Sequence, residues 1–550
     1  MASDPVSAEP AGFRRGHTAR VGHNAVVQLA SQLIIIAVGI VLTPLIVSKL
    51  GLATYGVWTF ITVTIGYLTL VDPGFYAAVV KFGAPRYAEG DRVTPARIAG
   101  FGVATWLAIG LLVSPLLFVV APFIADHLKG SGVAEGQIGW LVSYTFVSLI
   151  FSASSSILGA VLVAAGEQWI SNVIDTLTRL LYGFVAAGLL LSGHGLAGLA
   201  IALGLQQVLS ALAMVIVIAR RIGPVVGNPF ALERSLLSQI VVFGGWAQMA
   251  NLFTTLNSMT DALVAGTFIN ASSVGVLSFG QRLARQIPYF STIPQDSLLQ
   301  ATSAKFGERE DLRALRRVAV DANRIIAMFT TLPGFGLIAV APIALAAWLN
   351  HSYRYAAVVT IILALSHIVL GMMRGARTIL IAVGHIGLNA KAQALALVAN
   401  VILTLALVGP LGLRGIVIGT LGASIVTTIY YQRRFHLILG LGLGEGLFAW
   451  AWRLVLPGAA AVAVCWMATA LMPASVVHQR GPALLAFAFL TLLYLLISSL
   501  GLRLCSGFNA ADYATLEKGL PAPLAKLFAC APIRWVAKVD VAGKPLTQPG

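Results

Sequence analysis

The amino-acid sequence predicts an all-α polytopic membrane protein of about 14 transmembrane helices, with two parallel six-helix repeats followed by two C-terminal helices. Composition gives the first support. Hydrophobic residues make up 58% of the chain, charged residues 10%, and the mean hydropathy is +0.88, whereas soluble domains carry about a quarter charged residues. The apolar residues also gather in long runs, and short sequence motifs return six runs later.

Apolar runs of about 20 residues are long enough to cross a bilayer as helices. The expected spans are residues 24–49, 54–80, 99–125, 137–165, 168–191, 195–219, 237–268, 271–304, 322–349, 354–383, 391–410, 415–438, 450–473 and 482–502. An even number of spans places both termini on one side. Most of the 36 Lys and Arg residues then lie on that side, which the positive-inside rule identifies as the cytoplasm. The net charge of +16 therefore reflects membrane topology, and nucleic acid is not expected as a partner.

The internal repeat sets the expected domain organisation. Lys81-Phe82-Gly83 returns as Lys305-Phe306-Gly307, and Gly56-Val57 returns as Gly275-Val276. Because six spans separate each pair, the two halves should share one orientation in the membrane. The expected segments are a cytoplasmic tail (1–23), an N-lobe (24–219), a cytoplasmic linker (220–236), a C-lobe (237–438), two extra spans (450–502) and a cytoplasmic tail (503–550).

Charged residues in the seventh and eighth spans are the first candidates for a functional site. A charge inside a membrane is costly and normally faces a bundle interior or a wet cavity. If these spans form a hairpin that turns near Asn270, helical rise places Asp261 and Arg282 roughly 14 and 18 Å deep, so the two can meet. Arg285 continues the face of Arg282. The two arginines either bind substrate in a cavity or pair with acids on other helices.

The fifth span carries a second candidate site. Asp175 and Arg179 are four residues apart, so they share one helix face and can pair. Either the pair neutralises itself, or Asp175 holds the guanidinium ready for an anionic substrate group.

Four further charges lie toward the cytoplasmic ends of their spans. Arg374 and Arg377 are expected to reach the inner headgroups, at the cytoplasmic entrance. Asp72 and Asp296 lie at equivalent places in the repeat, next to prolines that permit a bend. These two acids either serve as gate or coupling-ion sites or only cap helices.

Other sites are not expected. No Lys lies in a phosphate-binding loop that would bind ATP, and no Cys/His cluster or H-E-x-x-H motif supplies a metal site. Neither a catalytic residue nor a cofactor is therefore predicted. His367 lies inside a span and is interpreted as a packing residue rather than a proton relay. The basic loop 305–324 should contact membrane lipids, or guide an anionic lipid to the entrance.

The sequence resembles the multidrug/oligosaccharidyl-lipid/polysaccharide exporter superfamily, in particular the Wzx-type oligosaccharide flippases of the polysaccharide transporter family. The resemblance covers about residues 24–440 and includes Thr43-Pro44-Leu45-Ile46-Val47-Ser48-Lys49-Leu50-Gly51, Tyr55-Gly56-Val57-Trp58 and Leu70-Val71-Asp72-Pro73-Gly74, and continues at Ala165-Gly166. Relatives often have Asp-Leu-Gly where this chain has Asp72-Pro73-Gly74. The resemblance implies the MATE-like pair of lobes.

The resemblance also implies a function in cell-surface polysaccharide biosynthesis. That function is outward flipping of polyprenyl-diphosphate-linked oligosaccharide across the cytoplasmic (inner) membrane by alternating access, with a polysaccharide polymerase and glycosyltransferases as partners. The arginines within the spans suit an anionic headgroup independently of this resemblance. The alternatives are a lipid II flippase, a multidrug or cation exporter of the same superfamily, and a membrane glycosyltransferase or polymerase. Short external loops without an acidic cluster argue against an enzyme.

Overall fold

The structure is a computed structural model. It describes residues 11–72, 74–127, 132–292, 295, 312–349, 354–382, 386–440, 447–473, 476, 480–510, 512–514 and 531–537. These residues form helices joined by short connections, and no strand occurs among them. The all-α prediction is confirmed.

The described helices confirm a multi-pass membrane protein but differ from the expected number of spans. Eleven helices are long and apolar enough to cross a membrane, and a bent pair raises the number to 12. The expectation of 14 continuous spans is therefore not met within the described part of the chain. The expected spans 237–268 and 271–304 have no counterpart among these helices, and the expected span 354–383 corresponds to the bent pair.

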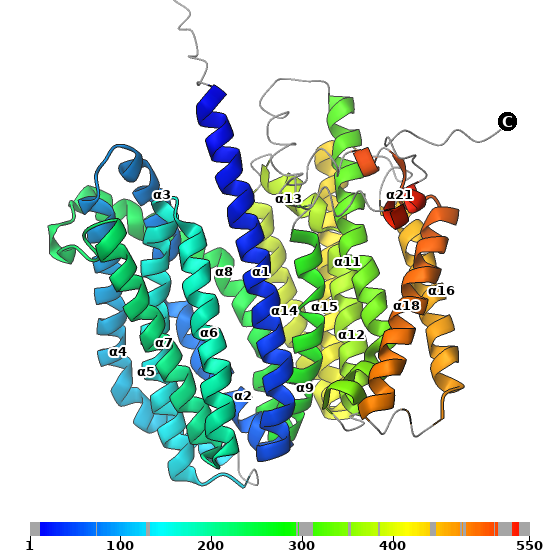
Figure 1. The fold of residues 1–550 in the computed structure, drawn as a ribbon, viewed down its shortest axis with the longest axis horizontal. Helices are drawn as coiled ribbons and strands as arrows, with labels where there is room; N and C mark the ends of the chain where they lie inside the picture. The colour runs from blue at the N-terminus through cyan, green and yellow to red at the C-terminus, as the bar shows by residue number, and fades with distance from the viewer. Residues whose placement is uncertain are drawn as a thin grey trace, which may run out of the picture. The chain divides into compact units, whose positions relative to one another are not determined.

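The chain forms two compact units, and the first contains residues 1–50, 68–126 and 133–248. Its helices are α1 (Ala11–Leu50), α3 (Phe75–Ala88), α4 (Val93–His127), α5 (Glu135–Ala164), α6 (Gln168–Leu191), α7 (Gly195–Arg221), η2 (Pro229–Ala231) and the first half of α8 (Arg234–Phe268). Helix α5 packs against α3, α6 and α7, and α1 packs along α6 (Figure 1). The fully buried side chains of Phe75, Trp106 and Ile157 form the centre of its core.

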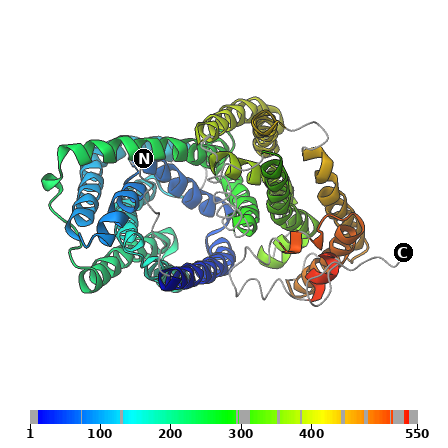
Figure 2. The ribbon, with the colours of Figure 1, turned by 90° about the horizontal axis from the view of Figure 1, so that it is seen from above.

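The second unit contains residues 51–67, 127–132 and 249–550. Its helices are α2 (Leu52–Gly66), the second half of α8, α9 (Ala271–Ala284), α11 (Leu312–Leu349), α12 (Arg354–Gly371), α13 (Arg374–Ala382), α14 (Ile386–Leu411), α15 (Leu413–Leu439), α16 (Leu447–Ala470), α18 (Arg480–Leu504) and α21 (Ala531–Ala537). Helix α14 packs along α15, and α12 packs against α9, α11 and α15. Helices α16 and α18, in orange, lie side by side and pack on α11 (Figure 2).

Helix α2 belongs to this second unit because it packs closely on α9. A Cβ atom on Gly56 would come within 1.8 Å of the carbonyl oxygen of Ala271, and one on Gly275 within 2.8 Å of Leu52. The ring of Tyr55 stacks on that of Phe279, with centroids 5.3 Å apart. The two helices thus contact each other through glycines that the sequence repeat relates to one another.

The expected span 54–80 is divided in the structure. Helix α2 ends at Gly66, the 3₁₀ segment η1 (Tyr67–Val71) follows, and α3 begins at Phe75. Gly74 has a φ of 79°, in the left-handed region that suits glycine. The expected span 271–304 is also interrupted, because α9 ends at Ala284 and helical structure resumes at Ile287 after a turn; part of that range lies outside the described residues.

The third correction concerns residues 354–383, where α12 and α13 meet at a bend of 40°. No proline lies at this break. Instead, the buried side chain of Asn323 on α11 occupies it. Its amide donates to the carbonyl oxygen of Met372 (3.0 Å), and its Oδ1 accepts from the backbone N–H of Ala376 (2.7 Å). Asn323 therefore satisfies a donor and an acceptor that the interrupted helix leaves open.

Candidate functional site

The candidate site in the second unit is built around Asp261 on α8. The predicted hairpin is confirmed, since α8 ends at Phe268 and Asn270 caps α9 by accepting a hydrogen bond from Ser273 N–H (2.8 Å). The Asp261 side chain is buried, with 3% of its surface exposed. One carboxylate oxygen accepts from Thr420 (2.7 Å) and the other from the amide of Asn400 (3.3 Å). Both oxygens of the acid are therefore occupied by neutral donors.

These contacts extend into a polar network between α8, α14 and α15. The Asn400 amide also donates to Oδ1 of Asn257 (3.0 Å), and its own Oδ1 accepts from Thr404 (2.8 Å). The network thus contains the carboxylate of Asp261 and side-chain oxygens of Asn257, Asn400, Thr404 and Thr420. Oxygen ligands suit a hard cation such as Na⁺ better than a transition metal. Within the described chain, no three His, Cys, Asp or Glu residues gather at a metal-binding distance.

Arg282 and Arg285 lie on α9 and at its C-terminal end, and both have exposed side chains. Asn400 and Thr420 donate hydrogen bonds to the Asp261 carboxylate, and the charge of Arg285 acts on it. The meeting of Asp261 with Arg282 stays a prediction. His367 on α12 lies within electrostatic reach of both Arg285 and Arg374. The arginines at the end of α9 and the start of α13 therefore share one region of this unit.

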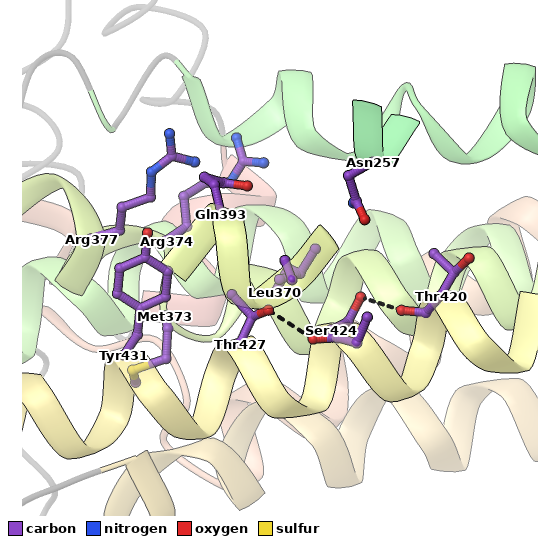
Figure 3. A pocket seen from close by; sticks show the side chains of 12 residues that line it. Asn257, Leu370, Met373, Arg374, Arg377, Gln393, Thr420, Ser424, Thr427 and Tyr431 are labelled. Carbon is purple, nitrogen blue, oxygen red and sulfur yellow. Dashed lines mark hydrogen bonds between the residues drawn. The ribbon is translucent and has the colours of Figure 1, made fainter. Parts of the chain in front are cut away.

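A cavity of about 90 Å³ opens between α8, α12, α13, α14 and α15 (Figure 3). It is lined by Asn257, Leu370, Met373, Arg374, Arg377, Gln393, Ala396, Thr420, Ala423, Ser424, Thr427 and Tyr431. The figure shows the guanidinium groups of Arg374 and Arg377 near one end, with Asn257 and Thr420 toward the other. Thr420 thus both lines the cavity and bonds to Asp261.

The break between α12 and α13 explains why Arg374 and Arg377 line this cavity. Arg374 is the first residue of α13, and both arginines are partly buried. One guanidinium N–H of Arg374 points to the carbonyl oxygen of Pro288 at 3.5 Å. The sequence predicted a continuous span ending at the cytoplasmic headgroups, and the bend redirects its last turns.

The first unit contains the other predicted pair, Asp175 and Arg179 on α6. Both side chains are exposed. Among the described residues, Asp175 and Arg179 do not form an ion pair within 4.0 Å. Asp175 instead accepts a hydrogen bond from Ser210 (3.4 Å), whose hydroxyl is 2.7 Å from that of Ser155. Arg179 is therefore not neutralised by a direct bond to Asp175.

The two predicted gate acids have different outcomes. Asp72 accepts hydrogen bonds from the backbone N–H groups of Gly74 (2.9 Å) and Phe75 (3.2 Å), so it caps the first turn of α3. Asp296 lies outside the described residues.

Sequence reasoning missed the neutral residues of the site. Asn257, Asn400 and Thr420 were not predicted, although an amide within an apolar span is itself a signal, because a buried polar group needs a partner. Gln393 and Tyr431 were missed for the same reason. Which of these side chains face one another depends on helix rotation, and the sequence does not specify that rotation.

Comparison with solved structures identifies the fold. The lipid II flippase MurJ, in an inward closed conformation, matches with a TM-score of 0.68 and 15% identity over 87% of this chain and 99% of MurJ. An inward-facing multidrug resistance MATE family transporter of the MOP superfamily matches with a TM-score of 0.58 and 17% identity, over 76% of this chain and 98% of its own. A mutant of the Vibrio cholerae MATE transporter VcmN matches with a TM-score of 0.51 and 18% identity, over 78% of this chain and 98% of VcmN. These likenesses show a shared transporter fold.

Sequence comparison adds the family. No curated protein matches this chain. A profile of the family described as "Polysaccharide biosynthesis protein" matches residues 50–358, more than half of the chain. The predicted resemblance to the multidrug/oligosaccharidyl-lipid/polysaccharide exporter superfamily is thereby confirmed. This chain belongs to the polysaccharide biosynthesis protein family.

Proposed function

We propose that the protein is a flippase that moves polyprenyl-diphosphate-linked oligosaccharide units outward across the cytoplasmic membrane for cell-surface polysaccharide synthesis. Family membership supports polysaccharide biosynthesis, and the transporter fold supports translocation rather than catalysis. In this proposal both termini are cytoplasmic, and the two six-span halves alternate access.

The observation that carries the proposal is the concentration of arginines on apolar helices of the second unit. Arg282, Arg285, Arg374 and Arg377 lie on or next to α9 and α13, and His367 lies within electrostatic reach of both helices. Guanidinium groups match phosphate oxygens in geometry and charge. A cationic drug would be repelled by this set of charges, which disfavours the multidrug alternative.

Arg282 and Arg285 are assigned to the substrate diphosphate, because their side chains are exposed although they lie among apolar helices. In the first unit, Arg179 and Asp175 are assigned to further headgroup contacts. Export of the glycan by cells carrying Arg282→Gln or Arg285→Gln tests the assignment. Both changes should abolish export at unchanged protein level, and Lys should restore it only in part because it lacks the bidentate fork.

Arg433→Gln is the matched control, because Arg433 is an exposed arginine on α15 of the same unit that does not line the cavity. Full export by both Gln variants would remove Arg282 and Arg285 from the substrate site.

A lipid II flippase is the second candidate, and the TM-score of 0.68 to MurJ favours it. The two functions separate in cells depleted of their own lipid II flippase. Growth restored by this chain would favour lipid II, and restored surface polysaccharide in a strain lacking its oligosaccharide flippase would favour the proposed substrate. The partner polymerase and glycosyltransferases would be identified by co-purification.

A further inference from the structure

The cavity in the second unit carries positive charge without a matching acid. Its 12 lining residues include Arg374 and Arg377 but no Asp or Glu. The two guanidinium groups are close enough for each charge to act on the other. Like charges that share a small cavity repel each other, and this repulsion favours a negatively charged occupant.

No acid elsewhere in the described chain takes that place. The ion pairs found within 4.0 Å there involve Arg86 and Arg324, and neither Arg374 nor Arg377. Among the described residues, the Arg374 side chain makes one hydrogen bond, the long one to the Pro288 carbonyl. Partly buried arginines are costly without a partner, so a pair with no acid among the described residues favours binding of an anion.

The nearest carboxylate of the polar network is already engaged. Asp261 connects to the cavity through Thr420, but its oxygens accept hydrogen bonds from Thr420 and Asn400. Within the described residues, no ion pair within 4.0 Å joins Asp261 to Arg374 or Arg377. Asp261 itself does not line the cavity.

The remaining lining groups favour an oxyanion over an uncharged sugar. The hydroxyls of Ser424 and Thr427 donate to backbone carbonyls of their own helix, and Tyr431 donates to Asn389 (2.8 Å). The hydrogen-bond donors left for a ligand are the two guanidinium forks and the amide groups of Gln393 and Asn257, whose Oδ1 alone is engaged by Asn400. Such donors fit the several oxygens of a phosphate group.

We propose that this cavity is an oxyanion site within the second unit, in which Arg374 and Arg377 bind a phosphate group with Gln393 as a third donor. The exposed pair Arg282 and Arg285 does not line this cavity. The phosphate comes either from a polyprenyl-linked headgroup or from free inorganic phosphate or diphosphate. The proposal rests on the proposed function only for the first of these sources, because the second requires no transport.

Calorimetric titration of the purified full-length protein in detergent tests the site. The probes are inorganic phosphate, inorganic diphosphate and undecaprenyl diphosphate. Arg374→Gln and Arg377→Gln should each weaken binding at least about 10-fold, and Arg374→Lys less, because one charge-assisted fork is lost. Arg433→Gln should bind as the wild type does. Because no flipping is measured, failure of the export proposal would leave this result intact.

Each outcome decides the question. Tighter binding of undecaprenyl diphosphate than of inorganic diphosphate, lost in the Gln variants, supports the site with a lipid source. Equal or tighter binding of the inorganic anions, lost in the same variants, supports it with a soluble source. Binding unchanged by both Gln variants, or absent for all three probes, overturns the proposal.

A second measurement uses only wild-type protein, so it does not depend on the folding of the variants. Phenylglyoxal modifies arginine side chains, and mass spectrometry locates the modified residues. Diphosphate should protect Arg374 and Arg377 from the reagent, while Arg433 should react at the same rate with and without it. Reaction of Arg374 and Arg377 at the same rate with and without diphosphate would contradict the site.

Discussion

Thr420 on α15 donates a 2.7 Å hydrogen bond to the carboxylate of Asp261 on α8, across 159 positions of the chain. The same residue lines the cavity that contains Arg374 and Arg377. The contact therefore joins a buried acid to a cationic cavity through one hydroxyl group. The contribution of this hydrogen bond to the free energy of unfolding can be measured.

Thr420→Val keeps the shape of the side chain but removes the donor to Asp261. A buried charged acceptor that loses its donor costs about 1.5–3 kcal/mol, so the free energy of unfolding should fall by that amount. Denaturant unfolding of the detergent-solubilised protein measures it. Thr427→Val is the control, since Thr427 bonds only to the Ala423 carbonyl of its own helix. Equal losses in the two variants would deny Thr420 a special role.

Gly56→Ala should separate α2 from α9. A Cβ at this position would lie 1.8 Å from the Ala271 carbonyl oxygen, which is backbone and cannot rotate away. Overpacking of this kind costs about 1–3 kcal/mol, and we expect a lower thermal midpoint and less monodisperse protein. Gly188→Ala on α6, where nothing lies within 4 Å, should be neutral or stabilising by up to about 1 kcal/mol. A Gly56→Ala protein as stable as the Gly188→Ala protein would contradict the close helix contact.

The turn between α3 and α4 should lose stability in acid. Hydrogen bonds from the Thr94 side chain and backbone hold the pKa of Asp91 below its ordinary value of 3.8. Because the folded state has the lower pKa, the stabilisation is present above pH 3.8 and is lost as the pH falls through the folded value. The thermal midpoints of wild type and Asp91→Asn should therefore differ at neutral pH and converge in acid. Glu89→Gln, an exposed acid in the same turn, is the control. A difference that persists unchanged in strong acid would refute the assignment.

Movement of the headgroup should respond to membrane potential. A diphosphate carries about two negative charges, and 100 mV, inside negative, favours outward movement by roughly 2.3 kcal/mol per charge, provided that no cation moves with it. In proteoliposomes at equal pH, a valinomycin-imposed potassium diffusion potential should speed flipping when the cytoplasmic side is negative. A rate that ignored potential and followed a sodium or proton gradient would instead favour an antiport. Asp261 would then be the first acid to replace, followed by Asp72 and Asp296.

The sequence predicted the parts of this protein that follow from periodicity and charge. The α8–α9 hairpin turns where Asn270 was expected, because an N-cap residue between two apolar runs is a local signal. The partners of Asp261 could not be predicted in the same way. Asn400 and Thr420 lie on other helices, and a rotation of either helix would replace them with different side chains. The sequence indicated in which helix each charged residue lies. Tertiary packing determined which residues it contacts.

The bend between α12 and α13 has a consequence for anyone who transplants parts of this chain. Its two stabilising hydrogen bonds come from Asn323, about 50 positions upstream on a different helix. A chimera that carried residues 354–382 without α11 would lose those bonds, and a straight helix could then form. A single substitution of Asn323 would likewise change the conformation at the α12–α13 break, although the sequence of that segment stays the same. Helices α11, α12 and α13 therefore form one structural unit, and a chimera should carry all three together.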